Sequence, residues 1–391
     1  MDQEECSTLM GVFQGIPDPR KARGQRYPWL FLLALVAAAL AGGQQTGHAV
    51  AHWISLHAEE LHERLRPPRA STPSEATLRR VLRGLDISVL EQRLTSHAQC
   101  LAAVAAEQGI IATTTGEVLQ GQAIDGKEVR GVRAYGQPLH LLSLVQHGSG
   151  RVLSQMAIEA KHNEITAAPQ LLAGRELHGT VTTMDAMHTQ ESFAQQILDQ
   201  HGHYLMVVKK NQSELYNAIA FLFEQPPWLP RQKAAEYQVH RTSEKGHGRL
   251  ERRVLEASPS LSGYLDWPGV GQVMRRHYER IILKTGEISS EITYGITSLP
   301  FSAVDAAALE QLWRGHWTIE NRVHRVRDGT MREDAGQIHA GQAAHTLAAL
   351  RNAILNLFRQ HGWTNIADAF RHYAASVQDC LDLIGAAKAR L

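Results

Sequence analysis

Three acidic residues of this chain have the types and positions required for metal-ion chemistry: Asp125, Asp185 and Glu320. Asp125 and Asp185 each end a segment that is predicted to be a strand, and each precedes a turn or a loop. If these two strands are neighbours, the two carboxylates lie side by side at the carboxyl edge of the sheet. Carboxylates that close repel each other, so the arrangement indicates bound cations. For either aspartate alone, a turn-forming role is the simpler interpretation.

Glu320 lies in a segment, residues 309–334, that is predicted to be a helix. Its apolar residues have the spacing of a face turned toward a core, and they are Leu309, Leu312, Ile319, Val323 and Val326. Glu320 borders that face and is surrounded on neighbouring turns by aromatic and cationic side chains, namely Trp313, His316, Trp317, His324 and Arg327. The two tryptophans could stack on a base or pack in the core. A lone glutamate on a helix is usually a surface residue, and it is the two aspartates that make a third acid meaningful.

Three converging acids suit phosphoryl transfer assisted by two Mg²⁺ ions, with Mn²⁺ as a substitute. In this hypothesis Asp125 bridges both ions, Asp185 holds one and Glu320 holds the other. The attacking group is water or a DNA 3′-hydroxyl, and the target is a phosphodiester. His316, His324 and Arg327 could contact the phosphates of the scissile strand or stabilise developing charge.

The chain has 391 residues, enough for two or three domains, and its composition of 43% hydrophobic and 20% charged residues is typical of globular proteins. A formal net charge of +1 gives no global signature of a nucleic-acid-binding protein, so contacts with double-stranded DNA must come from local patches. The candidate DNA-binding residues are Arg20, Lys21, Arg23, Arg79, Arg80, Arg83, Lys127, Arg130, Lys209, Lys210, His247, Arg249, Trp313, His316, Trp317, Arg322, His324 and Arg327. Each charge run alone is also compatible with a solvated face.

Three widely spaced cysteines, Cys6, Cys100 and Cys380, form no CxxC pair, which favours a reducing compartment and counts against a thiolate zinc site. The apolar run over residues 29–42 is too short to span a bilayer and follows a long polar segment with several prolines. We therefore expect a buried helix there, no membrane partner and a cytoplasmic protein.

Residues 1–108 have helical patterns and are predicted to form an N-terminal DNA-binding domain. Helices are expected over residues 30–40, 48–65 and 74–85, and prolines separate the last two. Ser74 is a candidate N-cap for the helix over residues 74–85, which turns three arginines outward. That helix is compatible with a helix-turn-helix DNA reader and equally with a plain amphipathic helix.

Residues 109–335 are predicted to form an α/β catalytic domain with a mixed sheet flanked by helices. The predicted order is strand, strand, strand, helix, strand, helix, strand, over residues 117–125, 139–147, 151–160, 163–173, 180–185, 190–200 and 204–209. A β-rich insertion with excess Lys and Arg follows at about residues 212–291 and includes a hairpin between residues 278–283 and 288–297. Residues 336–391 are expected to form a C-terminal helical region.

Seven segments in order resemble DDE transposases of the ISAs1 type, which include the H-repeat-associated proteins and are similar to IS4-like transposases. They are IPDPRKARGQRYPWLFLLAL near the start, AIDGKEVRG around Asp125, KHNEI from Lys161, TMDAMHTQ around Asp185, GHGRLERR from Gly246, YGITSLP from Tyr294 and RGHWTIENRVHRVRDGTMRED around Glu320. Where the IS4-like signature has Tyr, Arg and Lys around its Glu, this chain has Trp313, His316 and Arg327. Asp328, Glu333 and Asp334 are further acids that could assist or replace Glu320.

The resemblance implies an RNase H-like core with the triad Asp125, Asp185 and Glu320. It also implies Mg²⁺-dependent cleavage and strand transfer at the terminal inverted repeats of a bacterial insertion sequence, by a homodimer in a synaptic complex with transposon ends and target DNA. When bound to DNA the protein would be associated with the nucleoid. Two alternatives remain open: a related nuclease that cuts without strand transfer, and a domesticated or inactive copy that only binds DNA.

Overall fold

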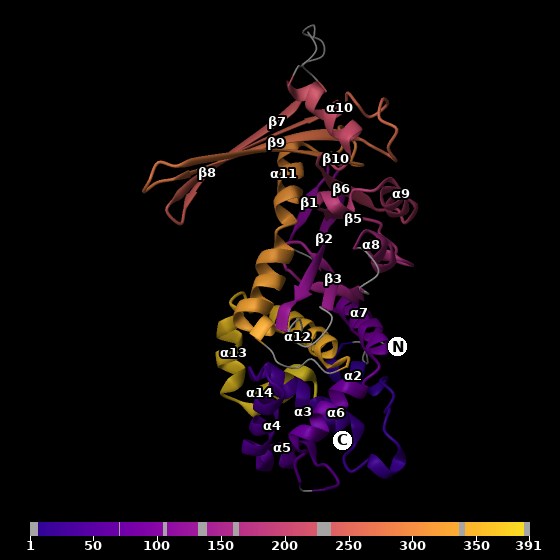
Figure 1. Ribbon diagram of the computed structural model, residues 1–391, viewed down its shortest axis with the longest axis vertical. Coiled ribbons are helices and arrows are strands. Elements are labelled where there is room, and N and C mark those ends of the chain that lie inside the picture. Colours follow the sequence, from indigo (N-terminus) through magenta and orange to yellow (C-terminus); the bar gives the residue numbers. More distant parts are fainter. Residues whose placement is uncertain are drawn as a thin grey trace.

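The computed structural model describes residues 7–69, 71–104, 108–131, 139–158, 164–224, 236–335 and 341–386. The molecule is elongated, with a helical body at one end, a sheet in the middle and a long strand arm at the other end (Figure 1). A single long helical segment, residues 306–330, contains Glu320 and runs alongside the sheet from the arm to the helical body (Figure 1).

The N-terminal part is helical, as predicted. Its α-helices are α2 (Leu9–Gln14), α3 (Trp29–Ala41), α4 (Gly47–Leu56), α5 (Ala58–Leu65), α6 (Glu75–Gly84) and α7 (Ile87–Val104). The helix expected over residues 48–65 is in fact two helices that meet at His57. Ser74 is the N-cap residue of α6, although its side chain makes no capping hydrogen bond.

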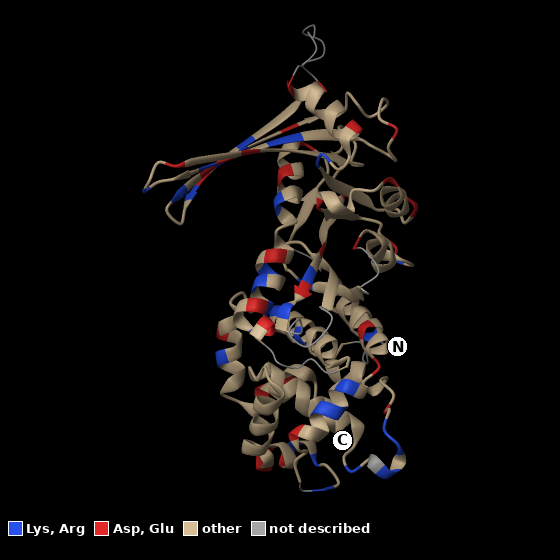
Figure 2. Ribbon diagram, viewed as in Figure 1, with Lys and Arg blue, Asp and Glu red and all other residues tan. Residues whose placement is uncertain are grey.

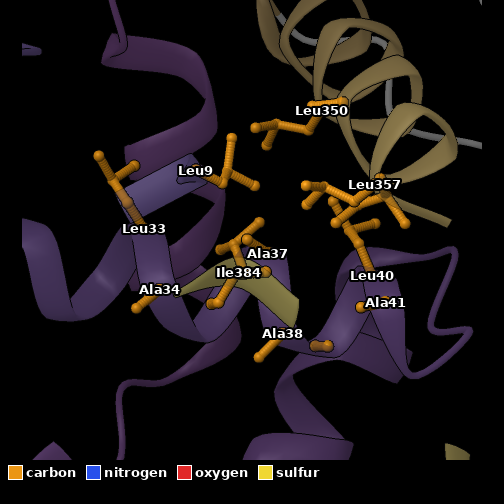
Figure 3. Packing of buried hydrophobic residues seen from close by; sticks show 14 of the residues in the cluster. Leu9, Leu33, Ala34, Ala37, Ala38, Leu40, Ala41, Leu350, Leu357 and Ile384 are labelled. Carbon is orange, nitrogen blue, oxygen red and sulfur yellow. The ribbon is translucent and has the colours of Figure 1, made fainter. Parts of the chain in front are cut away.

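The N-terminal and C-terminal helices share one hydrophobic core (Figure 3). Helix α3 is buried on all sides from Phe31 to Ala41, as its uniformly apolar sequence predicts. It packs against the C-terminal helices α12 (Ala343–Gln360) and α14 (Val377–Ile384), and α13 (Ile366–Ala374) lies beside them. Segments from opposite ends of the chain thus form one helical body.

The central sheet has the strand order β4-β3-β2-β5-β6-β10-β9-β8-β7. Strand β2 (Val118–Val129) pairs antiparallel with β3 (Leu139–Gln146), which pairs antiparallel with β4 (Val152–Ile158). On its other side, β2 pairs parallel with β5 (Thr180–Met184), and β5 pairs parallel with β6 (His203–Val208). This order is the RNase H-like arrangement, and helices α8 (Glu164–Leu172) and α9 (Glu191–Asp199) flank it, so the expected fold is confirmed. A short strand β1 (Ile110–Ala112), which was not predicted, pairs with β2.

The predicted β-rich insertion continues the same sheet. Strand β10 (Ile288–Thr297) pairs with β6 and with β9 (Gln272–Ile282), and β8 (Arg249–Ser258) and β7 (Gln238–Gly246) extend the sheet into the arm (Figure 1). The expected hairpin is present as β9 and β10. A helix that was not predicted, α10 (Ser213–Glu224), packs against β9 and β10.

Helix α11 (Ala306–Gly315) leads into two stretches with π-type hydrogen bonding, Ile319–His324 and Val326–Thr330. The predicted helix over residues 309–334 is therefore present for most of its length, but its hydrogen bonding changes near Glu320. A π-helical stretch widens the turn and is frequently found at functional sites.

Cys380 is a free buried thiol, whereas Cys100 is disulfide-bonded. The disulfide at Cys100 does not support the reducing compartment that the cysteine spacing indicated. None of the helices in the described part of the chain has the length and apolarity needed to cross a bilayer.

Candidate active site

The two predicted aspartates occupy equivalent places on neighbouring parallel strands. Ile124 of β2 and Met184 of β5 are register partners, and Asp125 and Asp185 follow them directly. The condition set by the sequence, that the two strands lie side by side, is therefore met. Asp125 does not end its strand, however, because β2 continues to Val129 and Asp125 itself pairs with Ser143.

The helical segment brings Glu320 and His324 to Asp125. Nδ1 of His324 lies 3.4 Å from Oε1 of Glu320 and 3.7 Å from Oδ2 of Asp125. Ile319 and Val323, on the same π-helical stretch, are completely buried and hold that stretch on the core. The side chain of Glu320 remains 48% exposed, so solvent and a substrate can reach its carboxylate.

These three side chains form a group that could hold a metal ion. One ligand atom from each of Asp125, Glu320 and His324 lies within 4.8 Å of the other two. Carboxylate oxygens are the ligands that Mg²⁺ and Mn²⁺ prefer, and imidazole is a ligand for several divalent transition metals. The donor set therefore fits a divalent cation.

Asp125 and Glu320 influence each other's protonation. Burial raises the pKa of Asp125, and the hydrogen bond to Glu320 and the negative charge of Glu320 raise that pKa further. The hydrogen bond with His324 lowers the pKa of Glu320. One proton is thus shared where two acidic side chains meet, as expected for two interacting carboxyl groups.

Asp185 is not part of this group of ligand atoms. Its carboxylate is 51% exposed and lies 3.3 Å from Nζ of Lys209. Burial alone would raise the pKa of Asp185, but the backbone N–H of Ala186 and the charge of Lys209 outweigh burial, and the pKa is lowered. A negative charge is therefore maintained on the strand beside Asp125.

Two histidines link the helical segment to the sheet behind the acids. His316 Nδ1 lies 3.1 Å from Oγ1 of Thr183, and His147 Nε2 lies 2.9 Å from the same hydroxyl. Burial lowers the pKa of His316 to about 4 and that of His147 to about 3, so both rings are neutral at pH 7. Two glycines make room for the His147 ring, because a Cβ on either Gly121 or Gly315 would lie 2.2 Å from its Nδ1.

Glu164 is a neighbour of the site that was not predicted to be a site residue, although it lies in the segment KHNEI. It begins α8, and its carboxylate lies where a Cβ of Gly126 would be, at 2.5 Å. Its negative charge contributes to the raised pKa of Asp125. The periodicity of α8 carries no signal for this contact, because the contact depends on how α8 is placed against β2.

Four of the residues expected to contact DNA are buried instead, namely His324, Arg327, Lys127 and Trp313. Arg327 has no exposed surface and forms an ion pair with Glu333, which also pairs with Arg351 of α12. Lys127 is 7% exposed and forms ion pairs with the two acids Asp328 and Asp334.

Trp313 is 5% exposed and packs over Gly295, so it belongs to the core. These side chains fix the helical segment to the sheet, and they have no surface to offer to a phosphate. Their ion pairs also occupy Asp328, Glu333 and Asp334, the acids that could have replaced Glu320.

The remaining candidates for DNA contact differ in their environment. Arg20 is engaged by Asp18 and Tyr27, while His316 and His324 face the site. The exposed candidates are Lys21, Arg23, Arg79, Arg80, Arg83, Arg130, Lys209, Lys210, His247, Arg249, Trp317 and Arg322. Lysines and arginines gather on the N-terminal helices, beside the long helical segment and near the tip of the arm (Figure 2).

Residues 117–357 match the family described as "Transposase DDE domain", and residues 10–98 match the family described as "DDE_Tnp_1-associated". The chain therefore belongs to the DDE transposase family. It is similar to the putative transposase YncI of Escherichia coli O157:H7, with 30% identity over 90% of this chain and 87% of that protein. It is also similar to the H repeat-associated putative transposase YhhI of E. coli K12, with 32% identity over 60% of this chain and 63% of that protein.

Among solved structures, the chain is similar to the piggyBac transposase in a synaptic complex with hairpin DNA. The TM-score is 0.47, the sequence identity is 8%, and the alignment covers 98% of this chain and 81% of that chain.

Proposed function

We propose that this protein cleaves DNA at the terminal inverted repeats of an insertion sequence and joins the ends to target DNA, in reactions that require Mg²⁺ or Mn²⁺. The observation that carries the proposal is the convergence of Asp125 of β2 and Glu320 of the helical segment on one partly exposed group. Membership of the DDE transposase family supports the same reaction class.

In this proposal Asp125 and Glu320 hold one divalent ion, and Asp185, on the neighbouring strand, completes the acidic site for a second. Divalent ions at such a site lower the pKa of an attacking hydroxyl and stabilise charge on the leaving oxygen. The fold of the chain sets the positions of the three acidic side chains. The β2–β5 register fixes the two aspartates, and the buried residues Ile319 and Val323 fix Glu320.

The exposed basic residues supply the DNA contacts. Arg79, Arg80 and Arg83 lie on the outward face of α6, which buries Leu78, Val81 and Leu82. Lys209 and Lys210 follow the strand beside Asp185, and His247 and Arg249 lie at the β7–β8 turn. When basic side chains contact the phosphates of DNA, they release the counterions of those phosphates. We therefore expect affinity for DNA to fall steeply as the salt concentration is raised.

Cleaving and joining two ends requires that both be held together, so we propose that the protein acts as a homodimer in a synaptic complex. Its place of action is then bacterial DNA in the cytoplasm. The residue ranges 1–108, 109–335 and 336–391 remain our proposed division into DNA-binding, catalytic and C-terminal parts.

The experiment uses the purified full chain, a labelled duplex with the sequence that flanks the gene on either side, and a supercoiled target plasmid. With Mg²⁺ we expect nicked or cut ends and labelled DNA joined to the plasmid. Hydrolysis without joining would contradict strand transfer and favour a nuclease. DNA binding without any cleavage would contradict both enzymatic functions.

A further inference from the structure

His324 is held against the two acids of the site by the fold. Its side chain is only 5% exposed, and it occupies the last position of the π-helical stretch that also carries Glu320. Its Nε2 is buried and has no partner in the described part of the chain, while Nδ1 lies near both carboxylates. The polar atom that the ring directs to the site is therefore Nδ1.

We propose that His324 is a ligand, through Nδ1, of the divalent ion that Asp125 and Glu320 hold. This inference rests on the proposed function, because it concerns the same ion. It gives His324 a role different from contact with a DNA phosphate, for which a buried ring is poorly placed.

The distances fit one shared ion. Two ligand atoms that each lie about 2.1 Å from an ion are about 3 Å apart when adjacent and about 4.2 Å apart when opposite. Nδ1 lies 3.4 Å from Glu320 Oε1 and 3.7 Å from Asp125 Oδ2, both within that range. Both distances exceed the length of about 2.7–2.9 Å that is typical of a charge-assisted hydrogen bond. The two separations from Nδ1 therefore fall between those of adjacent and opposite ligands of one ion.

The donor chemistry predicts metal preference. Mg²⁺ strongly favours an all-oxygen set, whereas Mn²⁺, which lies at the start of the transition-metal affinity series, accepts an imidazole nitrogen more readily. A site with one nitrogen and two carboxylates should therefore bind Mn²⁺ more tightly than Mg²⁺. Replacement of His324 by Gln should lower the affinity for Mn²⁺ by roughly tenfold and lower the affinity for Mg²⁺ less.

The test detects the nitrogen directly. Electron spin echo envelope modulation would be recorded on the full-length chain with substoichiometric Mn²⁺, for the wild type, for His324→Gln and for His178→Gln. His178 is exposed and lies before the amino end of β5, away from the carboxyl end that carries Asp185. We expect imidazole ¹⁴N modulation in the wild type and in His178→Gln, and its loss in His324→Gln. The wild-type spectrum is informative even if His324→Gln does not fold.

Two results would overturn the assignment: bound Mn²⁺ without nitrogen modulation in the wild type, or modulation that persists in a folded His324→Gln. A Mn²⁺ titration of Asp125→Asn separates this failure from failure of the proposed function. If Asp125→Asn loses Mn²⁺ while the wild-type spectrum lacks nitrogen, the carboxylate site stands and His324 is not a ligand. If the wild type binds Mn²⁺ no better than Asp125→Asn, both the His324 assignment and the proposed metal site are contradicted.

Discussion

Asp125 and Asp185 extend from equivalent positions of two parallel strands, one residue beyond the register pair Ile124 and Met184. Of these two aspartates, Asp125 belongs to the group of ligand atoms formed with Glu320 and His324, and Asp185 does not. The carboxylate of Asp185 instead forms an ion pair with Lys209, at 3.3 Å.

Asp185→Asn tests whether this neighbour takes part in the reaction. We expect DNA cleavage to be lost while affinity for DNA stays within about a factor of three, because the substitution removes a charge and keeps the shape. Cleavage would be followed on labelled duplex and binding by fluorescence anisotropy. Asp199→Asn, at an exposed acid at the end of α9, should leave both unchanged. Normal cleavage by Asp185→Asn would remove this residue from the site.

Gly315 controls the approach of the helical segment to the sheet. A Cβ at this position would lie 2.2 Å from Nδ1 of His147, and a Cβ on Gly121 would lie at the same distance from that atom. Gly315→Ala should therefore push Glu320 away from Asp125, lower stability by about 1–3 kcal/mol and reduce cleavage more than DNA binding.

The matched control is Gly329→Ala on the same segment, where a Cβ would have no neighbour within 4 Å. Urea unfolding and cleavage rates measured side by side decide the outcome. Equal behaviour of the two variants would show that the His147 ring does not set the position of the segment.

Glu333 is the buried anion that anchors the end of the helical segment. Its carboxylate lies 2.7 Å from Arg327 and 3.2 Å from Arg351, and its side chain is completely buried. Glu333→Gln leaves two buried guanidinium groups without their counterion, so we expect a loss of about 3–5 kcal/mol in the free energy of unfolding. Glu60→Gln breaks the exposed pair with Arg64 and should cost about 0–1 kcal/mol. A small effect for Glu333→Gln in chemical denaturation would refute the anchoring role.

The buried ring of His147 should make the folded protein less stable in mild acid. Burial lowers the pKa of this ring from 6.5 to about 3, so the folded state holds it neutral while the unfolded state takes up a proton below pH 6.5. The neutral His147 ring makes its full contribution to the free energy of unfolding above pH 6.5. That contribution is lost as the pH falls from 6.5 toward 3, by about 1.4 kcal/mol per pH unit.

Denaturant unfolding of the wild type at pH 7 and at pH 5 should therefore differ by about 2 kcal/mol from this residue. His147→Gln should have a flatter pH profile than the wild type, whereas His178→Gln should follow the wild type. A His147→Gln profile as steep as that of the wild type would exclude the ring as the source.

The strand-and-helix pattern was sufficient to predict a mixed sheet flanked by helices, and the resemblance to DDE transposases implied its RNase H-like core. It could not show that Gly126 lies inside β2. A glycine after an apolar run normally indicates a turn, but here the missing Cβ leaves space for the carboxylate of Glu164 from another element. The burial of Arg327 could not be predicted either, because its partner Glu333 also pairs with Arg351, which comes from α12.

Helix α10, by contrast, could have been predicted from the sequence. Helix α10 has buried apolar residues at helical spacing, Leu215, Ile219, Leu222 and Phe223, within the range predicted to be β-rich. The π-type hydrogen bonding near Glu320 had no such signal. It depends on how the segment packs against the sheet, and local sequence preferences do not encode that packing.

The most direct test of the account is single-turnover cleavage of a labelled duplex carrying the element's end, by the wild type, Asp125→Asn and Glu320→Gln. We predict cleavage by the wild type with Mg²⁺ or Mn²⁺ and none with EDTA. Each variant should be slower by at least about a thousandfold, or about 4 kcal/mol of transition-state stabilisation, while it still binds the duplex. Cleavage at the wild-type rate by either variant, or by the wild type in EDTA, would contradict the proposal that these two carboxylates form a metal-dependent active site.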